Sequence, residues 1–239
     1  MRLDKLLANM GFGTRKTVKT LLKAKEVTVN GIVIKDGKSQ VDPDKDKVVV
    51  AGEAVEYQEF VYFMLHKPQG VVSATNDNLH KTVIDLLAPK DQVLDPFPVG
   101  RLDKDTEGLL LLTNDGTLAH NLLSPKKHVD KCYKATINGI VNEQDILAFK
   151  NGITLNDGFN CQSAELDILS IDFDAEQSII QVTIHEGKFH QVKRMFEAVD
   201  KSVTYLKRLS MGNLKLDETL EIGKYRQLTE EELSSLTNE

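Results

Sequence analysis

The chain has two cysteines, no metal-binding histidine pattern and no long apolar segment. Cys132 and Cys161 form no Cys-x-x-Cys pair, which argues against a disulfide framework and against a zinc site built on thiolates. No His-Glu-x-x-His occurs, and no histidine stands at ligand spacing from a cysteine. No apolar stretch reaches the length of a membrane span, and residues 1–5 carry charges where a signal peptide needs an apolar core. These absences predict a cytoplasmic protein that has no metal centre and no membrane contact.

Acidic residues outnumber basic ones, and the net charge of −6 at first argues against a nucleic-acid partner. The charge is unevenly distributed, however. Residues 1–40 carry nine Lys or Arg against three acidic residues, whereas residues 217–239 carry two against seven. Contacts with phosphate depend on the local field and not on the total charge. The basic N-terminal segment therefore keeps nucleic acid among the candidate partners.

Residues 1–58 have the pattern of a small separate domain. A first amphipathic helix is indicated by apolar residues at i, i+3, i+4 and i+7, namely Leu3, Leu6, Leu7 and Met10. Thr14 suits the N-cap of a second helix, one side of which carries a row of cations: Arg15, Lys16, Lys19 and Lys23. Two β-rich runs then flank Asn30-Gly31, which predicts a hairpin.

Residues 59–239 are expected to form a second, α+β domain behind a polar linker around residues 52–60. The expected strands are residues 61–65, 109–112, 131–137, 164–169 and 178–184, and the expected helices are residues 83–87, 118–123, 143–149 and 191–198. Thr229 and Glu232 have the spacing of a capping box that starts a C-terminal helix. Strands separated by irregular loops and single helices favour a mixed, mostly antiparallel sheet.

A polar cluster at residues 100–108 directly precedes four consecutive leucines. Because the leucines predict a buried strand, the cluster is held against the core. It reads as a charged loop, as a calcium loop, or as the site of a catalytic carboxylate. The calcium pattern fails, because it needs a glutamate where the chain has Asn114. In the third interpretation Asp103 is the catalytic group, and Arg101 orients a phosphate-bearing substrate or holds the loop.

The segment GRLDKDTEGLLLLTNDG at residues 100–116 resembles the signature of ribosomal RNA pseudouridine synthases, in the branch that includes the small-subunit enzyme. The resemblance implies that Asp103 is the catalytic aspartate. Residues 131–135, KCYKA, are similar to the family strand whose tyrosine packs on the target base, a role that falls on Tyr133. Residues 186–196, EGKFHQVKRMF, are similar to the third motif, whose basic residue pairs with the aspartate, a role that falls on Lys193. The chain departs from the family at His66, where asparagine is usual, in a segment that the resemblance places at the sheet edge near the cleft.

What the resemblance implies is isomerisation of uridine to pseudouridine, which needs no cofactor. Arg101 would help to extrude the nucleotide or bind its phosphate. The N-terminal region is similar to the RNA-binding domain named after the fourth small-subunit ribosomal protein, with contacts expected from Arg2, Arg15, Lys16, Lys19 and Lys23. The form of the third motif, and the end of the chain soon after Glu232 without a basic extension, resemble the small-subunit enzyme and imply 16S rRNA as the target. We expect a monomer that acts on this RNA or on an assembling particle.

Three alternatives to this function remain. The chain could be an enzyme of the same family that modifies large-subunit (23S) rRNA, or an RNA-binding ribosome assembly factor without activity. A glycoside hydrolase with paired carboxylates shares the chemistry at the anomeric carbon, but it explains neither the basic N-terminal region nor Lys193. The joint presence of Asp103, Tyr133 and Lys193 in matching segments favours the pseudouridine synthase, because a protein that only binds RNA has no need for all three.

Overall fold

The computed structural model describes residues 1–124 and 127–237 and divides the chain into two compact units. The first, called the head, consists of residues 1–61 together with residues 87–96. The second, called the body, consists of residues 62–86 and 97–239. The domain boundary expected after residue 58 lies three residues before residue 61, where the first segment of the head ends. The division into domains at residue 58 stays a prediction.

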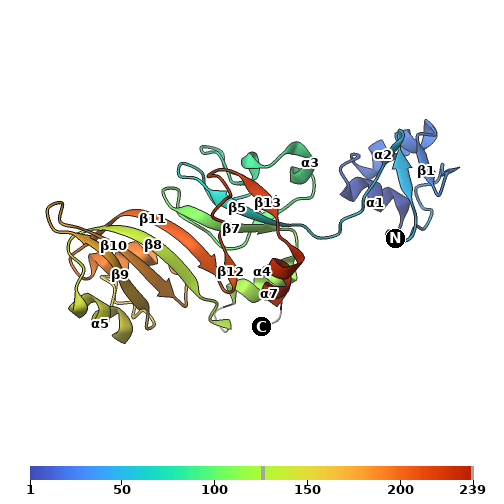
Figure 1. Cartoon of the computed structure of the whole chain (residues 1–239). Helices are drawn as coiled ribbons and strands as arrows, with labels where there is room; N and C mark the ends of the chain where they lie inside the picture. Colours follow the sequence, from blue (N-terminus) through green and yellow to red (C-terminus); the bar gives the residue numbers. More distant parts are fainter. Residues whose placement is uncertain (125–126, 238–239) are drawn as a thin grey trace. The chain divides into compact units, whose positions relative to one another are not determined.

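The head consists of two helices and a small sheet (Figure 1). Helices α1 (Leu3–Asn9) and α2 (Arg15–Lys23) are followed by strands in the order β2-β1-β3-β4, with the bounds β1 Val27–Val29, β2 Ile32–Val33, β3 Val48–Val50 and β4 Glu53–Ala54. The side chain of Thr14 caps α2 by accepting from the backbone N–H of Thr17. Asn30 and Gly31 both have positive φ, 52° and 81°, as a tight hairpin turn requires. The predicted order of two helices and a hairpin is confirmed.

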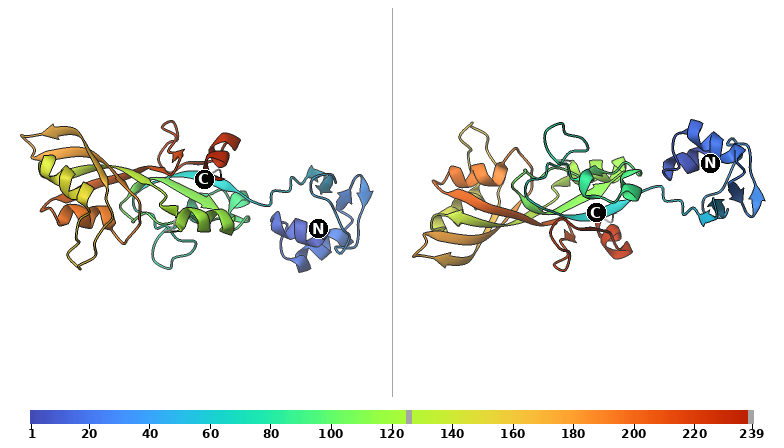
Figure 2. Two further views of the ribbon diagram at one scale, coloured as in Figure 1. Left: turned by 90° about the horizontal axis from the view of Figure 1, so that it is seen from below. Right: turned by 90° about the horizontal axis from the view of Figure 1, so that it is seen from above.

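The body is built on one nine-stranded sheet that twists along its length (Figure 2). Its main path is β13-β5-β7-β11-β8-β10-β9, with β6 paired to β7 and β12 paired to β11. All of these pairings are antiparallel except β7 with β11. The mixed, mostly antiparallel sheet and the α+β class are therefore confirmed. The strands are β5 Tyr62–Lys67, β6 Phe97–Pro98, β7 Glu107–Thr113, β8 Lys131–Asn138, β9 Glu165–Asp172, β10 Gln177–Ile184, β11 Ser202–Met211, β12 Leu214–Lys215 and β13 Tyr225–Gln227.

Short helices pack on the sheet at two places. Helices α4 (Gly116–Leu123) and α7 (Glu230–Thr237) join a buried cluster with β5, β7 and β12. Helices α5 (Glu143–Asn151) and α6 (Gln191–Glu197) meet through the rings of Phe149 and Phe196, whose centroids are 4.8 Å apart. The capping box of α7 is confirmed, since Thr229 and Glu232 exchange hydrogen bonds.

The elements differ from the expectations in three details. The short helix expected at residues 83–87 is a 3-10 helix, η1 (Ile84–Leu86), and a helix that was not predicted, α3 (Pro89–Gln92), follows it. Strand β11, the longest of those described, was also missed. Its sequence places Lys207 and Arg208 in the middle of the strand, which breaks the apolar pattern that identifies buried strands.

Gly108 lies where β7 pairs with β11, in close contact with the backbone of Arg208. It pairs in register with Arg208, and a Cβ atom on Gly108 would lie 2.2 Å from the Arg208 carbonyl oxygen. Its φ of +107° is also unfavourable for any residue with a side chain. Glycine at this position therefore permits the parallel pairing that joins the two halves of the sheet.

Replacing Gly108 with alanine should lower the free energy of unfolding by about 3 kcal/mol or more, because a backbone clash adds to a strained φ. Urea unfolding followed by circular dichroism measures the loss. Gly116→Ala is the matched control, since no atom lies within 4 Å of its Cβ position, and its stability should change by about 0.5 kcal/mol or less. Equal stability of the two variants would contradict the role of Gly108.

Candidate active site

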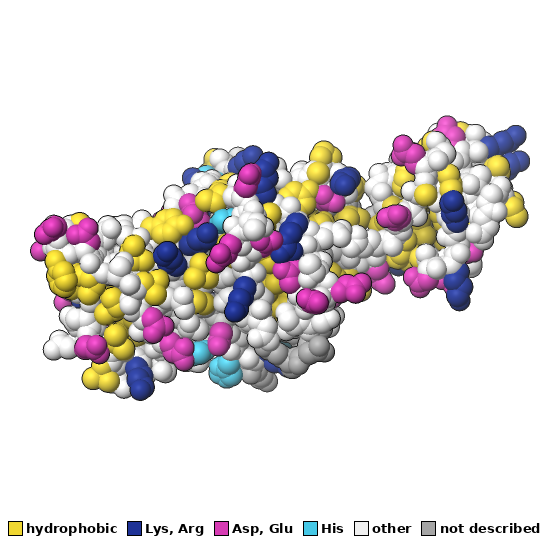
Figure 3. All heavy atoms as spheres, viewed as in Figure 1, with side chains coloured by type: hydrophobic (Ala, Val, Ile, Leu, Met, Phe, Trp, Pro, Cys, Tyr) yellow, Lys and Arg dark blue, Asp and Glu magenta, His cyan; other side chains and the backbone are white. Residues whose placement is uncertain are grey.

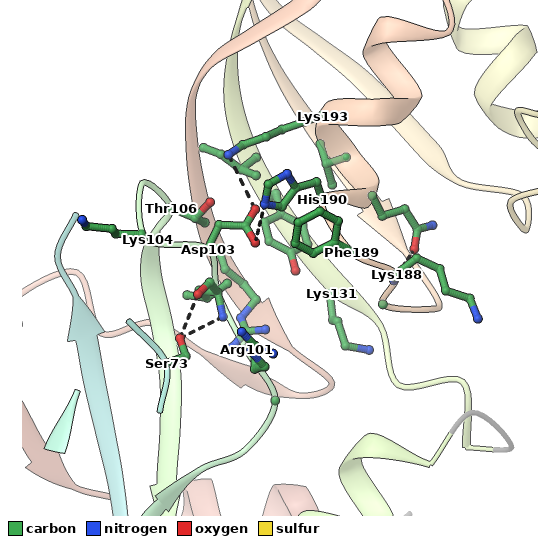
Figure 4. A pocket seen from close by; sticks show the side chains of 18 of the residues that line it. Ser73, Arg101, Asp103, Lys104, Thr106, Lys131, Lys188, Phe189, His190 and Lys193 are labelled. Carbon is green, nitrogen blue, oxygen red and sulfur yellow. Dashed lines mark hydrogen bonds and ion pairs between the residues drawn. The ribbon is translucent and has the colours of Figure 1, made fainter. Parts of the chain in front are cut away.

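A cavity of about 670 Å³ opens in the body (Figure 4). Most of its lining comes from four segments that are distant in the sequence: the loop before β7, strand β8, the residues that lead into and begin α6, and strand β11. Its size falls in the range of about 300–1,000 Å³ that is usual for ligand sites. The arrangement brings all three motif segments of the sequence to one place.

The cavity wall is strongly basic. Six of its residues are Lys or Arg: Arg101, Lys104, Lys131, Lys188, Lys193 and Arg208. Among the described residues that line it, Asp103 is the one acidic side chain. Burial and the neighbouring Arg208 lower the pKa of Lys131. The cavity thus suits a polyanion, although the whole chain is acidic.

The carboxylate of Asp103 lies between two nitrogen-bearing side chains of the α6 region. Its Oδ1 is 3.5 Å from Nε2 of His190, and its Oδ2 is 3.6 Å from Nζ of Lys193 (Figure 4). The Asp103 side chain retains 27% of its exposure, so the carboxylate remains accessible from the cavity. The proximity of His190 to Asp103 was not predicted from the sequence.

Lys193 contacts two carboxylates. The expected partner was Asp103, but Nζ lies closer to Asp105, at 2.6 and 2.8 Å from its two oxygens. This hydrogen bond lowers the pKa of Asp105. Asp105 therefore ties the loop to α6, while the predicted pairing of Lys193 with Asp103 is present at a longer distance.

Two buried side chains hold the loop that carries Asp103. Lys67, at the end of β5, is fully buried, and its Nζ donates to the carbonyl oxygens of Asp103 and Thr106, each at 2.9 Å. The hydroxyl of Ser73 donates to the carbonyl of Leu102 at 2.9 Å and accepts from its N–H at 3.0 Å. The sequence interpretation assigned neither of these roles, because side chains that bind backbone carbonyls follow no spacing rule.

Tyr133 and Arg208 stand side by side on β8 and β11 and line the cavity. Tyr133 lies where the sequence placed it, with 7% of its surface exposed. Arg208 is buried, and its Nε donates to the carbonyl of Leu109 at 2.8 Å. Its buried Nη2 has no hydrogen-bond partner among the described residues. An N–H in this position needs an acceptor, which a bound molecule can supply.

Arg101 and Glu107 flank Asp103 along the chain but differ in their contacts. Arg101 is exposed at the cavity and makes no hydrogen bond or ion pair within the described part of the chain, which leaves its guanidinium available to a ligand. Glu107 accepts a hydrogen bond of 2.7 Å from the hydroxyl of Tyr205. Burial and this carboxylate together raise the pKa of Tyr205. Glu107 therefore anchors the start of β7 to β11.

The cations of the head follow α2. Arg15, Lys16, Lys19 and Lys23 are exposed, whereas Val18 and Leu22 face the core. Arg2 is different, because its guanidinium binds the buried carboxylate of Asp4 at 2.5 and 3.0 Å. On the face drawn in Figure 3, several basic side chains project from the head. Their contact with RNA stays a prediction.

Neither a metal cluster nor a membrane helix is found among residues 1–124 and 127–237. No three His, Cys, Asp or Glu side chains there are grouped to hold a metal ion, and no helix there has the length and apolarity of a bilayer span. Cys132 and Cys161 are free thiols. Burial raises the pKa of Cys161 to about 11, so it stays protonated at neutral pH.

Comparison with known proteins gives consistent matches over the whole chain. The model for RNA pseudouridylate synthases matches residues 61–198, and that for the S4 domain matches residues 1–48. The uncharacterised RNA pseudouridine synthase YtzG of Bacillus subtilis is 53% identical, with 99% of this chain and 98% of the relative covered. The ribosomal large subunit pseudouridine synthase B of the same organism is 42% identical (98% and 95% covered), and the small subunit pseudouridine synthase A of Yersinia pestis is 38% identical (99% and 98% covered). A crystal structure of a pseudouridylate synthase superposes with a TM-score of 0.68 at 36% identity, with 99% of both chains covered.

Lys67 should make the free energy of unfolding depend on pH between about 8 and 10.5. Burial lowers the pKa of its ammonium to about 8, from the 10.5 of an ordinary lysine. Between these values the unfolded chain holds a proton that the folded protein has lost, so the contribution of Lys67 to the free energy of unfolding rises with pH in this window. The difference in unfolding free energy between wild type and Lys67→Met should grow by at most about 1.4 kcal/mol per pH unit.

Urea unfolding at several pH values across this window measures the difference. Lys215→Met serves as the control, because Lys215 is exposed on β12, and its difference from wild type should stay constant with pH. A constant difference for Lys67→Met as well would contradict a buried ammonium at this position.

Proposed function

The chain belongs to the RNA pseudouridylate synthase family, and on that premise we infer that it converts uridine in ribosomal RNA to pseudouridine. The observation that supports this most directly is that, among the described residues that line the cavity, Asp103 is the one carboxylate and six others are Lys or Arg. A basic wall attracts the phosphates of RNA, and an ionised carboxylate can act at a ribose carbon. The matched S4 domain supplies a second RNA-binding unit.

The reaction makes modest demands on the protein. The bond between C1′ and N1 of uridine breaks, C1′ joins C5, N1 gains a proton and C5 loses one. All atoms balance without an oxidant, a reductant or an added group. The protein has to supply an ionised carboxylate at the sugar, a surface that holds the detached base, and exclusion of water.

We assign the carboxylate to Asp103, which either attacks C1′ or removes the 2′ proton to give a glycal. Lys193 and His190, whose nitrogens lie within 3.6 Å of its oxygens, would hold the carboxylate in place. Tyr133 would stack on the uracil, since a π-face tolerates rotation of the base better than fixed hydrogen bonds do. Arg101, which has no partner in the described residues, would bind the phosphate of the extruded nucleotide.

Small-subunit (16S) rRNA is the proposed target. The version of the third motif at residues 190–193, His-Gln-Val-Lys, resembles that of the small-subunit enzyme, and the relative named for the small subunit is 38% identical. Large-subunit (23S) rRNA is the second candidate, because the relative named for the large subunit is 42% identical. We further propose that the protein acts in the cytoplasm, where ribosomal RNA is available, and that it acts as a monomer.

Release of tritium from C5 of uracil tests the activity. With RNA that carries tritium at this position, Asp103→Asn should reduce release by about 10⁴-fold or more, because an amide replaces the reacting carboxylate. RNA affinity should be retained. Asp167→Asn, at an exposed position on β9, is the matched control and should release tritium at the wild-type rate.

The substrates for this assay are naked small-subunit RNA, naked large-subunit RNA and partly assembled particles. If the wild-type protein released no tritium from any of these substrates, the proposal would be overturned and an RNA-binding factor without activity would be favoured. Mapping pseudouridine in the ribosomal RNA of cells that lack the protein identifies the target. A missing modification in 23S rRNA alone would decide for the second candidate.

The head should contribute phosphate contacts. Replacing Lys19 and Lys23 with glutamine should weaken RNA binding for all sequences alike and reduce the slope of log affinity against log salt by about one per lysine. Filter binding at several salt concentrations measures both quantities. Lys45→Gln is the control within the head, because the Lys45 ammonium is paired with Asp42 at 3.1 Å. An unchanged slope in the double variant would show that α2 does not contact the RNA backbone.

A further inference from the structure

Phe189 is an exposed aromatic side chain at the cavity. It lines the cavity, yet 75% of its surface is accessible to solvent. Leaving a phenyl ring in water forgoes the burial energy that most phenylalanines gain on folding. What distinguishes Phe189 from other exposed apolar residues, such as Phe173, is that its ring lines the cavity and can contact a molecule bound there.

One face of the Phe189 ring is already occupied. It stacks on the imidazole of His190, with centroids 3.7 Å apart and planes inclined by 18°. Nε2 of His190 also lies 3.5 Å from the Asp103 carboxylate (Figure 4). His190 thus contacts both the Asp103 carboxylate and the exposed ring of Phe189.

The surrounding contacts hold Phe189 in place. Arg194 donates to the carbonyl of Phe189 at 3.2 Å and pairs with Asp157. Lys188 lies 4.8 Å over the ring of Phe159. His190 itself has a left-handed backbone, with φ of 50°, a conformation that persists only where the surroundings enforce it. The exposure of Phe189 is therefore a feature of a well-anchored segment.

We propose that Phe189 is a stacking platform for the nucleobase next to the target uridine. Extruding one uridine leaves its neighbour in the RNA without a stacking partner, and an exposed phenyl ring beside the cavity replaces that partner. Single-stranded RNA is held in this way by aromatic side chains backed by cations. Lys131 and Lys188, which line the same cavity, lie near Phe189 and can bind the connecting phosphates (Figure 4). This inference rests on the proposed function and adds a subsite to it.

A coupling experiment tests the platform. The substrates are the shortest ribosomal RNA fragment that the wild type modifies, and two derivatives with an abasic nucleotide directly 5′ or 3′ of the target. On the intact fragment, Phe189→Ala should lower kcat/KM by about 5- to 100-fold, the range typical of base–aromatic stacking. Phe189→Tyr should restore most of the loss. On one abasic derivative, wild type and Phe189→Ala should be equal within about twofold, because the interaction is already absent.

A merely structural role for Phe189 would give the same loss on all three substrates, and that result would overturn the proposal. Phe173→Ala is the control, since Phe173 is equally exposed, at 73%, but lies outside the cavity in the turn between β9 and β10. It should behave as wild type throughout. Failure of the proposed function is distinct, because the wild type would then modify no fragment at all.

Discussion

The geometry of the site depends on the hydrogen bonds that the buried ammonium of Lys67 donates to backbone carbonyls. It lies at the end of β5 and donates to three carbonyl oxygens, those of Pro68, Asp103 and Thr106. A cation in a fully buried position is costly unless its donors are satisfied. The three carbonyl oxygens must therefore all point at the Lys67 ammonium. This requirement restricts the conformation of the loop and fixes the position of the Asp103 backbone.

Loop and sheet constrain each other through Gly108. The parallel pairing of β7 with β11 is possible because Gly108 has no side chain, and it places Arg208 beside the cavity. On its other edge, β11 pairs with β8, which carries Tyr133. The cavity residues thus come from segments on both sides of β11, so the cavity depends on the pairing of β7, β11 and β8.

Sequence patterns predicted the parts of the protein that follow local rules. Thr14, Asn30 and Gly31 were identified because caps and tight turns need particular residue types, and the motif segments of Asp103, Tyr133 and Lys193 do meet at one cavity. Strand β11 was missed because Arg208 interrupts its apolar pattern. The roles of Lys67 and Ser73 were missed because each binds a backbone carbonyl across the fold, and no sequence spacing encodes such a contact.

Lys193 contacts Asp105 at short distance and Asp103 at longer distance, and this difference has a chemical consequence. A carboxylate that is locked in a short ion pair is a poor nucleophile and a poor base, because its lone pairs are engaged. Lys193 makes its short contacts with Asp105 and remains 3.6 Å from Asp103. If Asp103 is the reacting group, as proposed, this spacing leaves its oxygens available to a ribose. Asp105 would then act on the reaction through Lys193, by holding the ammonium at a distance from the Asp103 carboxylate.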